Sequence, residues 1–233
     1  MSSDKNQSVS QLPLDLSVEV STGREDLIES PANEMAIALI DAWPDWPGRV
    51  TVIAGPIGSG KTHIAKVWAI QAQAVTVPSS DLADRLDEIL DAVTQGHGVL
   101  VEDANAETVE ENALFHLINA VRQNQTFCLI TSRSWPLEWN VQLPDLKSRL
   151  KAAQVVELQE PDEFLLQAVI MKLFADRQLM VDEKVISYCT MRMERSLEAA
   201  GRLVEAMDEE ALARKSGLTK AVAARALNRL GMA

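Results

Sequence analysis

Short apolar runs alternate with stretches of helical period from about residue 31 to residue 160. Runs of this kind, separated by helices, are typical of a parallel sheet that is covered on both faces. Strands are expected at Val50–Ala54, Ala74–Val77, Val99–Glu102, Phe127–Thr131 and Val155–Leu158. Helices are expected before and between them, at Pro31–Trp43, Lys61–Gln73, Asp81–Val93 and Val109–Asn124. The alternation predicts an α/β fold built on a five-stranded parallel sheet.

The pattern changes after Pro161, where the apolar runs stop and only helical periods continue. Ser216-Gly217 separates the last two of the four helices expected there, at Asp162–Arg177, Asp182–Met193, Ser196–Met207 and Thr219–Leu230. At the other end, residues 1–24 are polar and aperiodic, so we expect a flexible tail. The sequence thus predicts three parts: a tail at 1–24, an α/β domain at 25–160 and a small all-helical domain at 161–233.

Composition indicates a cellular compartment and narrows the classes of binding partner. The two cysteines, Cys128 and Cys189, lie in apolar segments and indicate no disulfide framework, which fits a reducing cytoplasm. We also expect no membrane segment, because no apolar run approaches about 18 residues. The net charge is −12, which is poorly suited to gripping a phosphate backbone, so strong direct DNA binding is not expected. The last twenty residues hold five basic and no acidic side chains, so a small local basic patch remains open.

A glycine-rich segment follows the first expected strand. It reads Gly55-Pro56-Ile57-Gly58-Ser59-Gly60-Lys61-Thr62 and fits the phosphate-loop pattern at every required position. Glycines let successive backbone N–H groups face one anion, and the following helix adds the positive end of its dipole. Lys61 can reach the outer phosphates, and the Thr62 hydroxyl can hold Mg²⁺. The segment therefore predicts binding of a nucleoside di- or triphosphate.

Two carboxylates, Glu102 and Asp103, stand at the end of the third expected strand. Beside a phosphate loop, one carboxylate usually orders Mg²⁺ and a second polarises the attacking water, with aspartate first. Two registers are open here. Glu102 can serve the metal and Asp103 the water, or Asp103 can serve the metal, which leaves Ala104 at the base position. Both registers predict weak intrinsic hydrolysis.

Three further segments carry groups that could act at a nucleotide. Thr131 and Ser132 end the fourth expected strand, where a hydroxyl could reach the γ-phosphate or its water, although Ser132 could equally cap the turn. Arg149, within Leu146-Lys147-Ser148-Arg149-Leu150, has the chemistry of an arginine finger for a neighbouring subunit's nucleotide, and a solvated charge is the other interpretation. Arg195 could reach the phosphates from the helical region or lie at the surface.

Together these segments resemble the AAA+ ATPase family and, within it, the DnaA-related regulatory inactivators of the Hda type. The resemblance runs from about Glu25 to the C-terminus and implies a helical lid after the α/β domain. It identifies Arg149 as the arginine finger, with Leu150 where an aromatic is usual, and Thr131 and Ser132 as sensor 1. Arg195-Ser196-Leu197-Glu198-Ala199 is similar to the sensor 2 pattern Arg-Glu-Leu-Glu-Gly. The resemblance implies ATP or ADP with Mg²⁺, with Asn33 near the adenine, and these nucleotide-binding residues: Gly55, Pro56, Gly58, Ser59, Gly60, Lys61, Thr62, His63, Arg195 and Asn33.

The polar tail contains one apolar cluster, Gln11-Leu12-Pro13-Leu14-Asp15-Leu16. It resembles the sliding-clamp-binding motif of Hda-type proteins. In that arrangement Leu12, Leu14 and Leu16 would enter an apolar groove while Gln11 hydrogen-bonds at its edge. The alternative is that the leucines fold back on the domain. Because the four helices expected after Pro161 leave no room before Ala233, we expect no separate helix-turn-helix domain of the kind with which DnaA reads DNA.

The resemblance implies a negative regulator of replication initiation. The tail would bind the sliding clamp, the DNA polymerase III beta subunit, and Arg149 would stimulate hydrolysis of ATP bound to DnaA. The alternative is a helicase-loader-type ATPase acting on single-stranded DNA, which the acidic charge and the Glu102-Asp103 order disfavour. A small-molecule kinase is a third possibility. It is disfavoured because the helical region offers no obvious acceptor site and the Arg149 segment would be unexplained. The resemblance leaves a homo-oligomer open.

Overall fold

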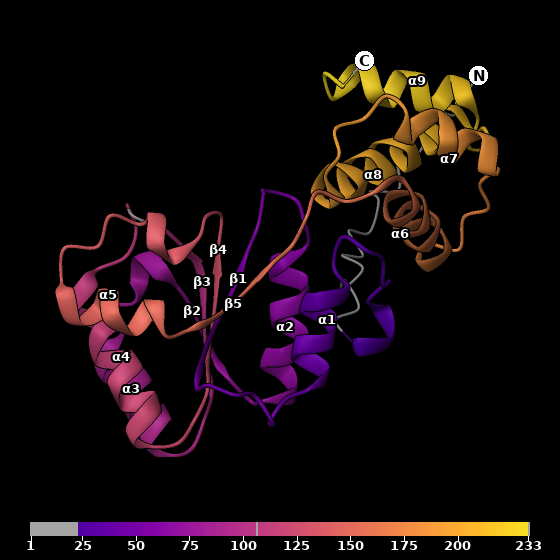
Figure 1. The fold of residues 1–233 in the computed structure, drawn as a ribbon. Coiled ribbons are helices and arrows are strands. Elements are labelled where there is room, and N and C mark those ends of the chain that lie inside the picture. The colour runs from indigo at the N-terminus through magenta and orange to yellow at the C-terminus, as the bar shows by residue number, and fades with distance from the viewer. Residues whose placement is uncertain (1–22, 106, 233) are drawn as a thin grey trace, which may run out of the picture.

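The computed structural model describes residues 23–105 and 107–232, and its centre is a five-stranded parallel sheet (Figure 1). The strand order is β2-β3-β4-β1-β5. The strands are β1 (Val50–Ala54), β2 (Val75–Pro78), β3 (Val99–Ala104), β4 (Cys128–Ser132) and β5 (Gln154–Glu157). Since β1 pairs with both β4 and β5, the loop that follows β1 leaves the carboxyl edge between two neighbouring strands. The α/β class with a five-stranded parallel sheet is confirmed.

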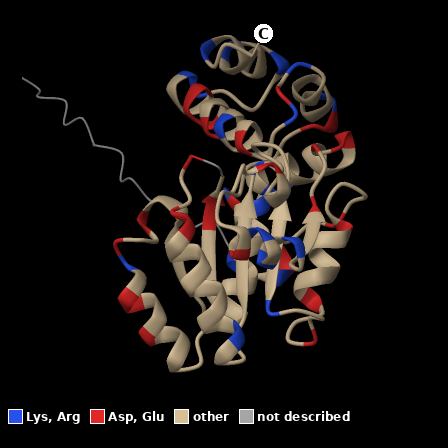
Figure 2. Cartoon of the chain, turned by 60° about the vertical axis from the view of Figure 1, so that its left-hand side comes forward, with Lys and Arg blue, Asp and Glu red and all other residues tan. Residues whose placement is uncertain are grey.

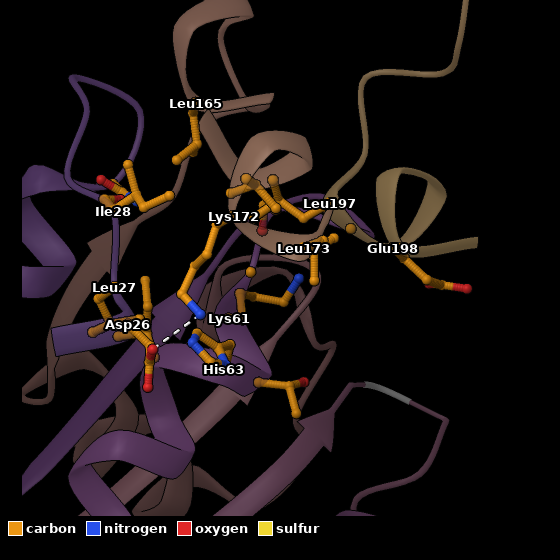
Figure 3. Close-up of a pocket in the computed structure, with 18 of the residues that line it drawn as sticks. Asp26, Leu27, Ile28, Lys61, His63, Leu165, Lys172, Leu173, Leu197 and Glu198 are labelled. Atoms are coloured by element: carbon orange, nitrogen blue, oxygen red, sulfur yellow. Dashed lines mark hydrogen bonds and ion pairs between the residues drawn. The ribbon is translucent and has the colours of Figure 1, made fainter. Parts of the chain in front are cut away.

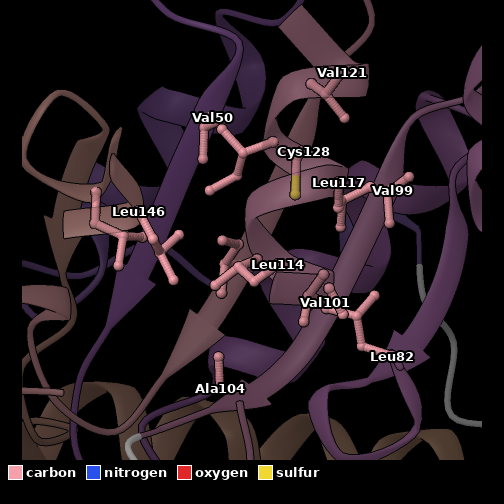
Figure 4. Packing of buried hydrophobic residues seen from close by; sticks show 14 of the residues in the cluster. Val50, Leu82, Val99, Val101, Ala104, Leu114, Leu117, Val121, Cys128 and Leu146 are labelled. Atoms are coloured by element: carbon pink, nitrogen blue, oxygen red, sulfur yellow. The ribbon is translucent and has the colours of Figure 1, made fainter. Parts of the chain in front are cut away.

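Alternating residues along the strands supply the two faces of the sheet. Val99 and Val101 of β3 pack into one core, whereas Leu100 packs into the other. Helices α3 (Leu86–Thr94), α4 (Glu111–Gln123) and α5 (Pro144–Lys151) cover the first face, where Figure 4 shows buried side chains of β3, β4 and α4 in contact. Helices α1 (Glu34–Asp41) and α2 (Lys61–Gln71) cover the second.

Four helices form a second part of the molecule with a core of its own. They are α6 (Glu163–Asp176), α7 (Glu183–Thr190), α8 (Leu197–Arg214) and α9 (Lys220–Arg229), and the buried residues of their core come from these helices and the turns between them. Each helix begins at a side chain that accepts a backbone N–H from its own first turn: Asp162, Asp182, Ser196 and Thr219. The expected helical C-terminal portion is therefore present.

The two cysteines are buried and free. Burial raises the pKa of the Cys128 thiol to about 12 and that of Cys189 to about 11, so both stay protonated at neutral pH. In the described ranges, no helix is long and apolar enough to cross a bilayer. Acidic and basic residues are interspersed along the helices of both parts (Figure 2).

Candidate functional site

The phosphate loop connects β1 to α2 at the carboxyl edge of the sheet. Gly58 has φ +74° and Gly60 has φ +98°, left-handed conformations that glycine adopts without steric cost. Gly60 is the N-cap of α2, so the helix starts at Lys61 with its positive dipole end toward the loop. The loop is anchored where it leaves the sheet, because the Gly55 N–H donates to the carbonyl of Ser132 on β4 at 3.1 Å.

Lys61 lies across this loop and is 9% exposed. Its Nζ donates to the carbonyl oxygens of Gly55, at 2.8 Å, and Pro56, at 2.7 Å. Desolvation by burial lowers the pKa of Lys61; the nearby charge of Asp103 opposes this shift and that of Arg133 adds to it. A phosphate oxygen would offer the ammonium a charged acceptor, which is a stronger hydrogen-bond partner than a neutral carbonyl.

One further feature of the loop fits a phosphate group, and a second shows why its first residue is glycine. The Ser59 hydroxyl is buried and has no hydrogen-bond partner among the described residues. A Cβ at Gly55 would lie 2.6 Å from the carbonyl oxygen of Leu158, so a larger residue cannot stand there without a shift. Thr62 is exposed in the first turn of α2, where its hydroxyl is free to meet a metal ion.

A cavity of about 530 Å³ opens beside the loop, between α2 and the helices α6 and α8. Its apolar lining includes the side chains of Leu27, Ile28, Leu165 and Leu173, which Figure 3 shows around one space. The volume falls in the range of small-molecule sites, and mixed apolar and charged walls are typical of them.

An ion pair crosses the wall of this cavity. Lys172 of α6 lies 2.9 Å from the Asp26 carboxylate, which belongs to the short helix η1 (Arg24–Asp26), as the dashed line in Figure 3 marks. His63 lines the same wall, and desolvation lowers its pKa, with Asp26 opposing the shift and Lys172 adding to it. Asp26 and Lys172 were not predicted, because neither belongs to a contiguous sequence pattern.

Asn33 holds the shape of the wall. Its Oδ1 accepts the backbone N–H of Ser30 at 2.8 Å, and its Nδ2 donates to the carbonyl of Ile28 at 2.9 Å. The side chain is buried and lines the cavity. Both ends of its amide are thus engaged in fixing the loop at residues 28–33.

The start of α8 touches the phosphate loop directly. The Leu197 N–H donates to the carbonyl of Gly58 at 2.8 Å, and a Cβ at Gly58 would collide with the Ser196 side chain. Arg195 is exposed and is not among the residues that line the cavity, although Ser196 and Leu197, which follow it, contact the phosphate loop. The structure therefore brings the predicted sensor 2 segment to the phosphate loop, with Arg195 at its outer edge.

The two carboxylates stand at a bulge in β3. Val101 pairs with Ile130 and Ala104 with Ser132, so two residues of β3 face one of β4. Asp103 is the residue in the left-handed region, with φ +54°, and its N–H donates to Thr131 Oγ1 at 2.9 Å. Asp103 therefore lies near both Lys61 and Thr131, whereas Glu102 is half-buried in the strand.

Ser132 has a local role. Its hydroxyl donates to the carbonyl of Ser134 at 2.7 Å and accepts the indole N–H of the buried Trp139 at 3.2 Å. This is the capping alternative for Ser132. Arg133, which belongs to none of the predicted site segments, forms a two-pronged ion pair with Asp103.

Arg149 lies away from this site, on the other face of the sheet. Leu146 and Leu150 anchor α5 in the core beneath α3 and α4, and the arginine between them is half-buried. No hydrogen bond or ion pair engages its guanidinium within the described part of the chain. The cavity beside the phosphate loop lies on the α2 side of the sheet, whereas Figure 1 shows α5 on the other side. The predicted clamp-binding residues Gln11, Leu12, Leu14 and Leu16 lie outside the described residues.

Comparison with known proteins supports the same fold. No family model matches this sequence. An uncharacterized protein of Haemophilus influenzae is 24% identical over 176 residues, which cover 72% of this chain and 76% of that protein. Domain III of the replication initiation protein DnaA from Thermotoga maritima superimposes with a TM-score of 0.76 at 20% identity, over 89% of this chain and 96% of that one.

Two other structures share this architecture. AMPPCP-bound DnaA from Aquifex aeolicus has a TM-score of 0.70 at 18% identity, over 85% of this chain and 69% of its own. The Holliday junction branch migration motor RuvB of Thermotoga maritima has a TM-score of 0.69 at 16% identity, over 85% and 68%. The chain therefore shares the fold of DnaA domain III and of RuvB.

Proposed function

We propose that this chain binds ADP or ATP in the cavity beside the phosphate loop. The support is the buried Lys61 ammonium, the unpaired Ser59 hydroxyl and the start of α2, which all belong to the phosphate loop or to the helix that follows it. Thr62 and one of the carboxylates Glu102 and Asp103 would hold Mg²⁺, which neutralises phosphate charge when bound. A similar fold with AMPPCP bound, in DnaA, adds to this support.

We further propose that the chain is a negative regulator of replication initiation that acts on DnaA. Arg149 would enter the nucleotide site of DnaA and promote hydrolysis of its ATP. The observation that carries this proposal is the placement of Arg149: its guanidinium has no partner among the described residues and stands on the face opposite its own cavity. A finger in that position is suited to a neighbour's nucleotide, because its own is out of reach.

The decisive experiment is a reconstituted assay of DnaA-bound ATP hydrolysis with a DNA-loaded sliding clamp. Arg149→Ala should reduce the stimulated rate by about 10³-fold or more, the range reported for arginine fingers. Lys147→Ala is the matched control, since Lys147 is exposed on the same helix α5 and should leave stimulation intact. Equal loss in both variants, or no loss in Arg149→Ala, contradicts the finger role.

The tail segment Gln11–Leu16 would tether the protein to the sliding clamp and raise its concentration near DnaA. Deleting residues 11–16 should abolish capture by immobilised clamp while nucleotide binding persists. Capture that survives the deletion contradicts the tether. The helicase-loader alternative predicts single-stranded DNA binding with a steep salt dependence, which the same protein can be tested for by fluorescence anisotropy.

A further inference from the structure

Arg133 and Asp103 form the most geometrically complete ion pair beside the phosphate loop. Nε of Arg133 lies 2.9 Å from one carboxylate oxygen of Asp103, and Nη2 lies 2.7 Å from the other. The planar guanidinium thus meets both oxygens at once, which fixes direction as well as distance. Both oxygens of this carboxylate are therefore engaged on the Arg133 side.

The backbone of Asp103 is held separately from its side chain. Its N–H donates to Thr131 Oγ1, and its carbonyl accepts the hydroxyls of Ser79, at 2.9 Å, and Thr108, at 3.2 Å. These bonds keep the residue in its left-handed conformation at the β3 bulge. With the main chain fixed, only the side-chain torsions can redirect the carboxylate, and the pair with Arg133 sets them.

The pair stands within electrostatic reach of the phosphate-binding ammonium. Asp103 and Arg133 act on the pKa of Lys61 in opposite directions, the carboxylate raising it and the guanidinium lowering it, after the larger effect of desolvation. Arg133 follows Ser132 directly, and the carbonyl of Ser132 anchors the phosphate loop. The pair thus borders the place where we expect the terminal phosphate of a bound nucleotide. This place is at the sheet edge that also carries Thr131.

We propose that Arg133 is a positioning residue that withholds Asp103 from the chain's own hydrolytic reaction. This inference rests on the nucleotide binding proposed above. In hydrolysis, a water oxygen bonds to the γ-phosphorus, the bond to the ADP oxygen breaks, and a water proton passes to a base. Asp103 can accept that proton only after its carboxylate leaves the guanidinium. The intrinsic rate is therefore set by the closed pair, which opens when Arg133 turns away.

The test is steady-state hydrolysis of ATP by the full chain without DnaA. Arg133→Gln should raise kcat by up to about fivefold, the factor by which a half-exposed ion pair biases an equilibrium, with KM for ATP unchanged. Arg133→Lys keeps the charge but loses the two-pronged geometry, so its kcat should lie between those of the natural chain and Arg133→Gln. Adding Asp103→Asn to Arg133→Gln should remove the gain. Arg85→Gln is the control, because it breaks a comparable surface pair with Glu88 on α3.

A second readout needs no nucleotide. In protein labelled with ¹⁵N-arginine, the Arg133 Nε–H should exchange with water several-fold faster in Asp103→Asn than in the natural chain. Equal exchange in both proteins, or a kcat that stays the same or falls in Arg133→Gln, overturns the inference. Failure to bind ATP or ADP would instead defeat the proposed function, while the exchange measurement still decides whether the pair is closed.

Discussion

His63 is a half-buried titratable residue at the cavity wall, one residue after the metal-binding candidate Thr62. Desolvation lowers its pKa from 6.5, and among the charges that face it Asp26 opposes the shift while Lys172 and Lys66 add to it. The folded protein therefore binds fewer protons at His63 than the unfolded chain does in the interval between the lowered pKa and 6.5. The contribution of His63 to the free energy of unfolding is therefore fully present above pH 6.5. It is lost as the pH falls from 6.5 through the lowered pKa.

We predict that His63→Gln flattens the acid side of the stability profile. Between about pH 7.5 and about pH 5, the natural chain should lose more unfolding free energy than the variant, by about 1.4 kcal/mol for each unit of pKa depression. Urea unfolding at the two pH values measures the difference. A parallel decline in both proteins would show that other groups account for the acid sensitivity.

At the scale of single residues, the site residues that could be predicted are those that belong to a contiguous sequence motif. The phosphate loop was readable because its glycines, Lys61 and Thr62 stand at fixed spacing. Arg133 was not, because its importance comes from the β3 bulge, which aims Asp103 toward the end of β4. A bulge is set by pairing between strands distant in sequence, so the residues around Arg133 in the sequence do not indicate it.

At the level of elements, the contact between the phosphate loop and the start of α8 links the two parts of the molecule. Gly58 has φ +74°, and its open side is filled by Ser196. We predict that Gly58→Ala lowers the unfolding free energy by about 1–3 kcal/mol, because the new methyl group must displace Ser196 and occupy a strained conformation. Gly217→Ala, where nothing lies within 4 Å, should change it by less than about 0.5 kcal/mol.

Thermal and urea unfolding of these two variants provide the measurement. Nucleotide affinity should also fall in Gly58→Ala, since the Gly58 carbonyl that binds Leu197 is part of the loop. If both glycine variants unfold alike, the packing of α8 on the loop does not contribute to stability.

Most elements were predicted; one helix was missed, and several others begin or end at different residues. The strand Val50–Ala54 was predicted to the residue, and the other four were within two residues at either end. Helix α5 was not predicted, because its eight residues hold only two buried positions, Leu146 and Leu150. Helix α8 continues to Arg214, beyond the expected Met207, where Glu210 pairs with Arg214 along its surface. The expected start at Asp81 is instead a 3-10 turn, with α3 beginning at Leu86.

On the scale of the whole molecule, the cavity lies where two separate cores meet. The α/β part supplies the phosphate loop and η1, and the helical part supplies α6 and α8. A ligand that touches both parts stabilises their contact by mass action. The pair between Asp26 and Lys172 is the charged link across this junction.

We predict that Lys172→Gln weakens ADP and ATP binding by about two- to fivefold while the melting temperature without nucleotide changes little, as expected for a partly exposed ion pair. Lys184→Gln on α7, outside the cavity, is the control. Isothermal titration calorimetry and thermal melts give the two quantities. A fall in the melting temperature as large as that caused by a core substitution would assign Lys172 to folding instead.

Trp139 gives this molecule an optical probe of its own. Its indole N–H is bonded to Ser132, the residue that precedes Arg133, and the ring is buried. A change at the end of β4 would alter the polarity around this indole and shift its emission. Replacing the other four tryptophans, Trp43, Trp46, Trp68 and Trp135, would leave one fluorophore whose emission wavelength reports the polarity at that strand end.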